Sequence, residues 1–229
     1  MKIIGHRGCN QLGGENTLKG IQAALDMGVN GVEIDLRMVG NKIIVLHDET
    51  VDRTTNGKGH YKTFNLKELQ NLECRNGCKI PLLEEIITIP KTVDELILEI
   101  KEPGIEKVLL STLRAKYPYI EHDRFKNVVV SSFDTETTEN LSSYLNDWNL
   151  AILYKDSFSF AMQRATTLGA GYIHAPVKDI SPARVHLAHS NNIEIYAYTV
   201  NEKKDYNLCL ASGVDGIFSD NPEKLINPQ

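Results

Sequence analysis

The segment Gly31-Val32-Glu33-Ile34-Asp35-Leu36 sets two acidic residues into a run that is otherwise apolar. Side chains alternate between the two faces of a strand, so Glu33 and Asp35 point to one side while Ile34 points to the other. Apolar runs of this length are typical of strands buried in a parallel sheet. The segment therefore predicts a strand that packs on one face and carries two carboxylates on the other.

Similar short apolar runs recur along the whole chain and alternate with longer amphipathic runs. The predicted strands are Lys2–Gly5, Gly31–Leu36, Glu95–Ile100, Val128–Ser131, Leu150–Tyr154, Gly171–His174, Ile193–Thr199 and Gly216–Phe218. The predicted helices are Thr17–Met27, Ile105–Lys116, Thr135–Leu145, Ser157–Leu168, Pro182–Asn191, Glu202–Ala211 and Pro222–Ile226. Asn16 is the expected N-cap of the first helix. Strand–helix alternation is typical of parallel βαβ units, and eight such strands predict an α/β fold of the closed (β/α)8, or TIM-barrel, type.

One interval breaks this rhythm, because the second and third strands lie much further apart than the other neighbours. Within it, Lys42–Leu46 is predicted as an extra strand and Pro81–Thr88 as a helix, whereas Asp48–Lys79 holds little periodicity. Loops that follow the strands of a barrel carry its functional site. We therefore expect residues 1–229 to form a single TIM-barrel domain in which residues 48–79 are a small cap insertion over the pocket mouth.

The composition is that of a globular chain with its own core. The 229 residues carry a formal net charge of −5, and 41% of them are hydrophobic, which is an ordinary value for such a chain. No basic cluster indicates a nucleic-acid partner, and no apolar run is long enough for a membrane span. We expect a cytoplasmic protein with a small-molecule substrate and reduced thiols, with a local Cys74–Cys78 bridge as the alternative. The sequence makes no prediction of the oligomeric state.

Three acidic residues are candidates for a metal site. Glu33, Asp35 and Glu99 all lie on the inward phase of predicted strands, where a barrel normally holds branched apolar side chains. Three carboxylates in one pocket repel each other strongly unless a cation lies between them. Oxygen ligands without cysteine suit one divalent ion, Mg²⁺ or Ca²⁺, better than zinc. The alternative is that one or more of these acids pair with Arg7, Lys101 or a cap residue.

His6 and His47 are the candidates for general acid–base catalysis. Each ends a predicted strand next to a charged residue, and histidine titrates near neutral pH. Arg7 and Lys101 are candidates for binding phosphate oxygens, or for balancing the charge of the carboxylates. Tyr198 ends another strand and is a candidate aromatic wall for the substrate. This combination of groups indicates a pocket for a phosphate ester.

These residues belong to a series of motifs spread over nearly the whole chain. The motifs are His6-Arg7-Gly8, Glu15-Asn16-Thr17, Glu33-Ile34-Asp35, His47-Asp48, Asp52-Arg53-Thr54-Thr55-Asn56-Gly57-Lys58-Gly59, Ile80-Pro81-Leu82-Leu83-Glu84-Glu85, Leu98-Glu99-Ile100-Lys101, Ser131-Ser132-Phe133-Asp134 and Thr199-Val200-Asn201. In this order and spacing the chain resembles the glycerophosphodiester phosphodiesterase family, especially its short bacterial cytosolic members. The resemblance implies a TIM barrel that cleaves glycerophosphodiesters to glycerol 3-phosphate and an alcohol.

The resemblance also implies a role for each candidate residue. It assigns the divalent metal to Glu33, Asp35 and Glu99, acid–base catalysis to His6 and His47, phosphate contacts to Arg7 and Lys101, a place in the site to Glu15, and a cover over the glycerol-binding side to residues 48–79. Two positions depart from the family pattern. Gly14 stands where the family often has proline, and Tyr198 stands where it often has tryptophan, which changes the aromatic wall and the expected substrate preference.

The predicted reaction is metal-dependent hydrolysis of a phosphodiester. One histidine removes a proton from the nucleophile and the other protonates the leaving alkoxide, with His6 as base and His47 as acid the preferred assignment. The nucleophile is either water or the glycerol hydroxyl beside the ester, the second giving a cyclic phosphate that water then opens. Two alternative functions stay open: a related lyase that releases the cyclic phosphate, and a barrel that binds glycerophosphodiesters without cutting them.

Overall fold

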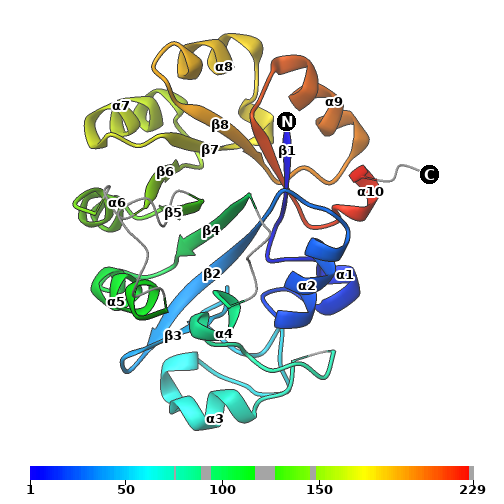
Figure 1. The fold of residues 1–229 in the computed structure, drawn as a ribbon, viewed down its shortest axis with the longest axis vertical. Helices are drawn as coiled ribbons and strands as arrows, with labels where there is room; N and C mark the ends of the chain where they lie inside the picture. Colours follow the sequence, from blue (N-terminus) through cyan, green and yellow to red (C-terminus); the bar gives the residue numbers. More distant parts are fainter. Residues whose placement is uncertain (75, 89–93, 117–126, 145–147, 227–229) are drawn as a thin grey trace.

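Eight parallel strands close into a ring at the centre of the computed structural model, which describes residues 1–74, 76–88, 94–116, 127–144 and 148–226 (Figure 1). The order around the ring is β1, β2, β4, β5, β6, β7, β8, β9 and back to β1. These strands are β1 (Lys2–Gly5), β2 (Gly31–Val39), β4 (Glu95–Ile100), β5 (Val128–Ser132), β6 (Asn149–Leu153), β7 (Tyr172–Pro176), β8 (Glu194–Tyr198) and β9 (Gly216–Ser219). Strand β3 (Lys42–Val45) lies outside the ring and pairs antiparallel with β2. The predicted TIM barrel is confirmed, including its extra strand.

Helices surround the ring on its outer side (Figure 1). They are α1 (Asn10–Gly13), α2 (Leu18–Asp26), α3 (Leu66–Asn71), α4 (Leu83–Ile86), α5 (Glu106–Lys116), α6 (Thr135–Ser142), α7 (Phe158–Leu168), α8 (Pro182–His189), α9 (Lys203–Ser212) and α10 (Glu223–Ile226), with 3-10 turns η1 (Tyr61–Thr63) and η2 (Val177–Asp179). Each predicted helix is present with ends shifted by a few residues. Leu145, the predicted end of the third of them, lies outside the described residues.

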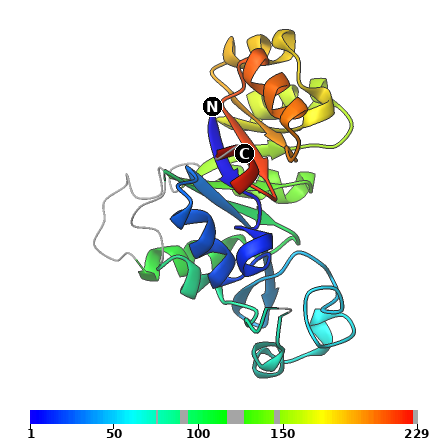
Figure 2. The same ribbon diagram turned by 90° about the vertical axis from the view of Figure 1, so that its right-hand side faces the viewer.

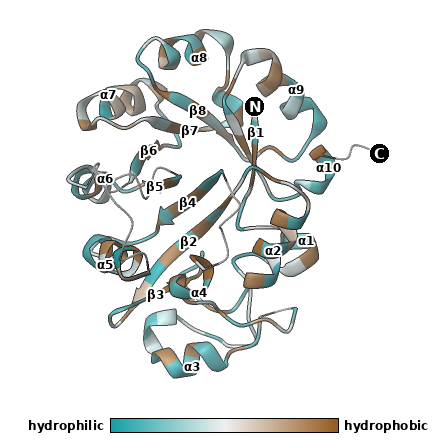
Figure 3. Ribbon diagram, viewed as in Figure 1, coloured by the Kyte–Doolittle hydropathy of each residue, from teal (hydrophilic) through white to brown (hydrophobic). Residues whose placement is uncertain are grey.

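The barrel strands are mostly apolar on both faces, and Figure 3 shows brown stretches along them that are interrupted by teal, hydrophilic ones on β2 and β4. Their outward residues, such as Ile34 and Leu98, pack in the main core with the helices. Their inward residues, such as Ile97 and Tyr196, form a second cluster inside the ring. Above this cluster the inward positions of β2 and β4 turn acidic, so the alternation of each strand places its carboxylates in the barrel mouth.

The start of α2 differs from the sequence prediction. Thr17, rather than Asn16, is the N-cap, since its hydroxyl accepts a hydrogen bond from the Gly20 amide at 3.0 Å. Asn16 instead adopts a left-handed conformation with φ of 55°, and its side-chain amide donates to Asp35 Oδ2 at 2.7 Å. Asparagine tolerates this backbone region better than most residues. Asn16 therefore binds Asp35 of the site, and Thr17 caps the helix.

The segment between β3 and α4 is more ordered than its sequence pattern predicts. It contains η1 and α3, and a small apolar core that includes Val51, Tyr61 and Leu69 packs against Ile44 of β3. Helix α3 begins with a capping box in which Asn65 and Glu68 satisfy each other's backbone amides. Figure 2 shows the segment, in cyan, projecting from one end of the barrel. The Asn65-x-x-Glu68 spacing is the local signal that predicts this helix.

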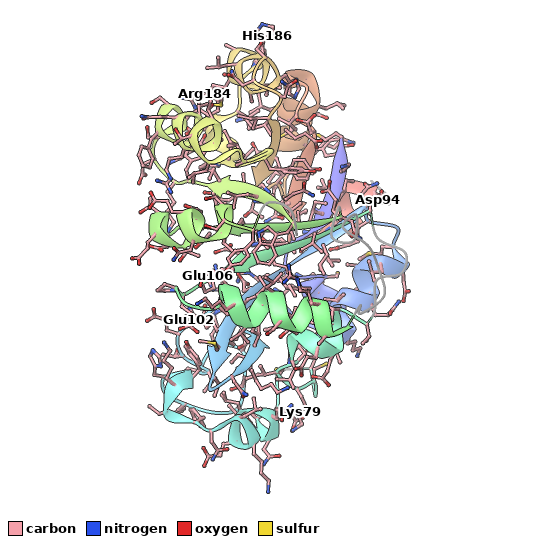
Figure 4. All side chains as sticks on the ribbon, turned by 60° about the vertical axis from the view of Figure 1, so that its left-hand side comes forward. Lys79, Asp94, Glu102, Glu106, Arg184 and His186 are labelled. Atoms are coloured by element: carbon pink, nitrogen blue, oxygen red, sulfur yellow. The ribbon has the colours of Figure 1, made fainter. Side chains whose placement is uncertain are left out.

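Glu102 fastens this segment to the barrel. Its carboxylate accepts hydrogen bonds from the Tyr61 hydroxyl at 2.7 Å and from the Met38 amide at 2.6 Å, and Lys62 Nζ lies 2.6 Å away. Figure 4 labels Glu102 at the level where α5 meets the segment. Because Met38 belongs to β2 and Tyr61 to η1, one side chain joins both parts.

Two expectations about the whole chain also meet the structure. All four cysteines are free, so Cys74 and Cys78 do not form the local bridge. Within the described ranges, no helix has the length and apolar character that a membrane-spanning helix needs.

Candidate active site

A cavity of about 180 Å³ opens at the carboxyl ends of the barrel strands, the end at which TIM barrels carry their sites. Seven of the nine predicted site residues line it: His6, Arg7, Glu33, His47, Glu99, Lys101 and Tyr198. The two others lie close by. Asp35 is fully buried between Arg7 and Lys101, and Glu15 contacts Arg7. The structure thus gathers residues from distant parts of the sequence around one hollow.

Three buried carboxylates form the acidic part of the site. Strands β2 and β4 are in register, with Asp35 opposite Glu99, and one oxygen of each of Glu33, Asp35 and Glu99 lies within 4.8 Å of the others. Burial and the neighbouring charge of Asp35 raise the pKa of Glu33 to about 8. The Lys101 and Arg7 charges outweigh the effect of burial at Asp35 and hold its pKa below the usual value. Burial and the mutual repulsion of the carboxylates therefore disfavour the ionised form of Glu33 unless a further positive charge is added.

The alternative in which these acids pair with bases holds for part of the cluster. Lys101 Nζ lies 3.0 Å from Asp35 Oδ1 and also donates to Glu99, and Arg7 Nε lies 3.2 Å from Asp35 Oδ2. Glu33 differs, because its Oε2 accepts from the Arg7 amide at 2.9 Å while its buried Oε1 has no hydrogen-bond partner among the residues that the structure describes. An unpartnered carboxylate oxygen beside two other carboxylates is a donor set that fits a hard divalent cation.

His6 is held by a carboxylate that the sequence analysis did not single out. Its Nδ1 lies 2.5 Å from Asp220 Oδ1, and Asn201 fixes Asp220 by donating from its side chain at 2.7 Å and accepting from the Asp220 amide at 2.9 Å. The opposite ring nitrogen, Nε2, lies 3.9 Å from Glu33. Burial would lower the pKa of His6, but the hydrogen bond that Asp220 accepts from the ring and the charge of Glu33 outweigh it and raise the pKa.

His47 is held in the same way by the residue that follows it. Its Nδ1 lies 2.6 Å from Asp48 Oδ1, and Arg37 donates two hydrogen bonds to the His47 carbonyl, at 2.8 and 3.1 Å. Burial and the positive charges of Lys101 and Arg7 lower its pKa. The two environments therefore shift the pKa values of the two imidazoles in opposite directions, upward for His6 and downward for His47.

Arg53 connects the two halves of the site. Its guanidinium donates to Asp48 at 2.6 and 3.1 Å and to Glu15 at 2.5 and 2.7 Å, while Glu15 also accepts from Arg7 at 3.1 Å. The chain His47–Asp48–Arg53–Glu15–Arg7 is therefore continuous. Glu15, expected to lie among the residues that hold the substrate, is placed where it supports Arg7.

The wall of the cavity opposite β2 is aromatic. Tyr198 lines it, donates its hydroxyl to the Tyr154 carbonyl and contacts Phe133 edge-on, with ring centroids 6.2 Å apart. His174 lies deeper, against Phe218 at a centroid distance of 4.8 Å. Within the described part of the chain its Nε2 is buried without a hydrogen-bond partner, and burial lowers its pKa to about 3.

The sequence profile of the Glycerophosphoryl diester phosphodiesterase family matches residues 6–224, which include every residue of this site. The chain belongs to this family. A glycerophosphodiester phosphodiesterase of Caldanaerobacter subterraneus subsp. tengcongensis is 31% identical over 98% of the chain and 96% of its own length. Another glycerophosphodiester phosphodiesterase, from Bacillus altitudinis, is 29% identical over 98% of the chain and 96% of its own length.

Solved structures of glycerophosphodiester phosphodiesterases share the fold. An Oleispira antarctica phosphodiesterase, determined in complex with its product sn-glycerol-3-phosphate, superposes with a TM-score of 0.86 at 24% identity, covering 98% of this chain and 95% of that one. A glycerophosphodiester phosphodiesterase from Agrobacterium tumefaciens gives a TM-score of 0.83 at 24% identity over 99% of both chains. The fold of this chain is thus shared with these solved structures.

Proposed function

We propose that this member of the glycerophosphodiester phosphodiesterase family hydrolyses glycerophosphodiesters to glycerol 3-phosphate and an alcohol, with a divalent metal and two histidines. The single observation that carries the proposal is the meeting of Glu33, Asp35 and Glu99 beneath a cavity that His6 and His47 both line. The sn-glycerol-3-phosphate found in the Oleispira antarctica enzyme supports the choice of substrate.

One divalent cation, Mg²⁺ or Ca²⁺, fits the three carboxylates. The buried Glu33 Oε1 without a partner and the raised pKa of Glu33 are the supporting observations. When bound, such an ion stabilises negative charge on a phosphoryl oxygen as a Lewis acid. Its charge would also let Glu33 stay ionised inside the barrel, because an adjacent positive charge favours the carboxylate form.

Arg7 and Lys101 serve the phosphate in this proposal. Both side chains line the cavity, and both are held at Asp35, so their positive charges are fixed before the substrate arrives. Preorganised charges of this kind stabilise developing negative charge without the cost of reorganisation. Glu15 orients Arg7, and Tyr198 forms the aromatic wall against which the substrate packs.

The two histidines divide the proton transfers between them. One accepts the proton of the attacking oxygen, and the other donates a proton to the alcohol oxygen as the bond from phosphorus to that oxygen breaks. Asp220 and Asp48 hold the two Nδ1 atoms, which leaves each Nε2 for the substrate. The attacking oxygen is that of water or that of the glycerol hydroxyl beside the ester.

Residues 1–229 act as a single unit in this proposal, and residues 48–79 cap the mouth of the cavity. Arg53 lies within that stretch and is tied to Glu15 at the rim, which supports a role for the stretch in closing the site. A lyase that releases the cyclic phosphate would need the same residues. A barrel that only binds glycerophosphodiesters would give His6 and His47 no catalytic role.

A coupled assay for glycerol 3-phosphate tests the proposal. Purified protein is incubated with glycerophosphocholine, glycerophosphoethanolamine or glycerophosphoglycerol, in Mg²⁺, Ca²⁺ or a chelator. Glycerol 3-phosphate should form with at least one ion and not after exhaustive chelation. Phosphorus NMR of the same mixtures separates the alternatives, because a persistent cyclic phosphate identifies a lyase and unchanged substrate identifies a binding protein.

A further inference from the structure

A second hollow adjoins the candidate active site. It has a volume of about 290 Å³ and lies where β5 and β6 end, between the first turns of α6 and α7. Phe133 and Leu153 line both hollows, so the two share a wall. The central cavity of about 180 Å³ is smaller than the roughly 300 Å³ at which ligand pockets usually begin. A diester has two arms on its phosphorus, and the adjoining hollow offers room for one of them.

The charged residues that line the second hollow are Lys155, Arg164 and Asp156. Arg164 is already engaged, since it pairs with Glu139 at 2.9 Å and donates to the Thr135 carbonyl at 2.8 Å. Lys155, by contrast, forms no ion pair, because no carboxylate within the described part of the chain lies in ion-pair distance of its ammonium. Its Nζ lies instead 4.6 Å from the centroid of the Phe133 ring. The face of Phe133, the aromatic residue that both hollows share, is therefore occupied by the protein's own cation.

We propose that this second hollow binds the alcohol arm of the diester, and that Lys155 makes it a site for neutral polyol or anionic alcohols rather than for quaternary ammonium groups. Hydroxyl groups of Ser157 and Thr135 line the same hollow and suit a polyol. A choline arm would meet the Lys155 ammonium at the one large aromatic face of the shared wall, and like charges repel. The inference rests on the proposed hydrolysis and names which glycerophosphodiesters it favours.

The test compares kcat/KM for glycerophosphoglycerol and glycerophosphocholine in the wild type and in Lys155→Glu. The ratio of the two values isolates the alcohol arm, because both substrates share the glycerol phosphate and any effect on that half cancels. Lys155→Glu should shift the ratio towards glycerophosphocholine on the order of tenfold, since charges in a hollow open to water interact only moderately. Lys155→Gln should give a smaller shift in the same direction.

Lys67→Glu is the matched control. Lys67 is equally exposed but lies on α3, at the far end of the segment that projects from the barrel, so the same change of net charge should leave the ratio as in the wild type. An unchanged ratio in Lys155→Glu, or an equal shift in Lys67→Glu, overturns the proposal while leaving hydrolysis intact. Release of glycerol 3-phosphate from neither substrate by the wild type overturns the proposed function itself, and the alcohol site with it.

Discussion

At the scale of single residues, the site depends on side chains that are held before any substrate binds. Both histidines have a carboxylate at Nδ1, at 2.5 Å for His6 and 2.6 Å for His47. Each carboxylate is itself fixed, Asp220 by Asn201 and Asp48 by Arg53. Groups that act as acid or base must lie within hydrogen-bond reach of the proton they move, so this anchoring is part of the proposed chemistry.

Removing either imidazole should cost most of the rate. His6→Ala and His47→Ala should each lower kcat by on the order of 10²–10⁴, the range for general acid–base catalysis, measured as release of glycerol 3-phosphate. His186→Ala, at an exposed position of α8, is the control and should keep the wild-type rate. Full turnover in either of the first two variants would contradict the role given to that histidine.

The support of His6 by Asp220 can be tested separately. Asp220→Asn keeps the size of the side chain but removes its charge, and hydrogen bonds to charged groups contribute about 1.5–3 kcal/mol. The corresponding expectation is a loss in kcat of about 10- to 100-fold with little change in KM. Asp215→Asn is the matched control, because Asp215 pairs with His189 at 2.9 Å just before β9, at the end remote from the site. Equal kcat values for the two variants would argue that Asp220 is only structural.

The protonation of His174 should affect the stability of the whole chain. Burial lowers its pKa from 6.5 to about 3, so between these pH values the unfolded chain binds a proton that the folded chain does not. The free energy of unfolding should therefore fall as the pH drops through this interval, by up to about 1.4 kcal/mol per pH unit from this group.

Denaturant unfolding of the wild type and of His174→Phe between pH 7 and pH 4 measures this effect. The phenylalanine variant cannot be protonated, so its stability should depend less steeply on pH. His186→Phe, at the exposed position labelled in Figure 4, should keep the slope of the wild type. Parallel curves for the wild type and His174→Phe would refute a buried neutral imidazole.

At the scale of elements, the sequence predicts the positions of the strands and helices better than the structure of the loops. The apolar runs of the barrel strands follow directly from burial on both faces, and the inward acids of β2 and β4 follow from the two-residue period. The segment between β3 and α4 shows little periodicity in its sequence, although Asn65 and Glu68 give a local helix signal. The small apolar core of this segment is built from a few residues that are scattered along the sequence. They form no run long enough to show a helical or strand period.

Arg53 gives this segment a role that can be measured. A planar guanidinium can hold Asp48 and Glu15 at once, whereas the ammonium of lysine lacks the fork geometry. Arg53→Lys should therefore lower kcat by about tenfold through looser His47 and Arg7 side chains, with a smaller effect on KM. Steady-state kinetics with glycerophosphoglycerol separate the two constants.

The control for this substitution is Arg184→Lys. Arg184 is exposed to a similar degree, pairs with Asp179 at 3.3 Å, and lies on α8 at the far end of the molecule in Figure 4. It should leave kcat unchanged. A wild-type kcat in Arg53→Lys would show that the connection between the two halves of the site is dispensable.

At the scale of the whole molecule, closure of the barrel brings residues that are distant in the sequence together at the site. Contacts of this kind cannot be predicted from local sequence patterns. Asp220 reaches His6 because β9 pairs with β1 and closes the ring, a contact across nearly the full length of the chain. Arg53 donates to Glu15, which lies far from it in the sequence, so no local sequence pattern predicts this contact. The candidate acids and histidines can be predicted from the sequence because each lies on or beside an apolar run, whereas their partners Asp220 and Arg53 lie in loops.

The central claim is that the three carboxylates share one divalent ion. The most direct measurement is anomalous scattering from crystals soaked in Mn²⁺, which prefers the same oxygen ligands as Mg²⁺. The account predicts one strong peak within bonding distance of an oxygen from each of Glu33, Asp35 and Glu99. Saturating Mn²⁺ with no peak there, and with Glu33 still unpartnered beside Asp35 paired to Arg7 and Lys101, would contradict it.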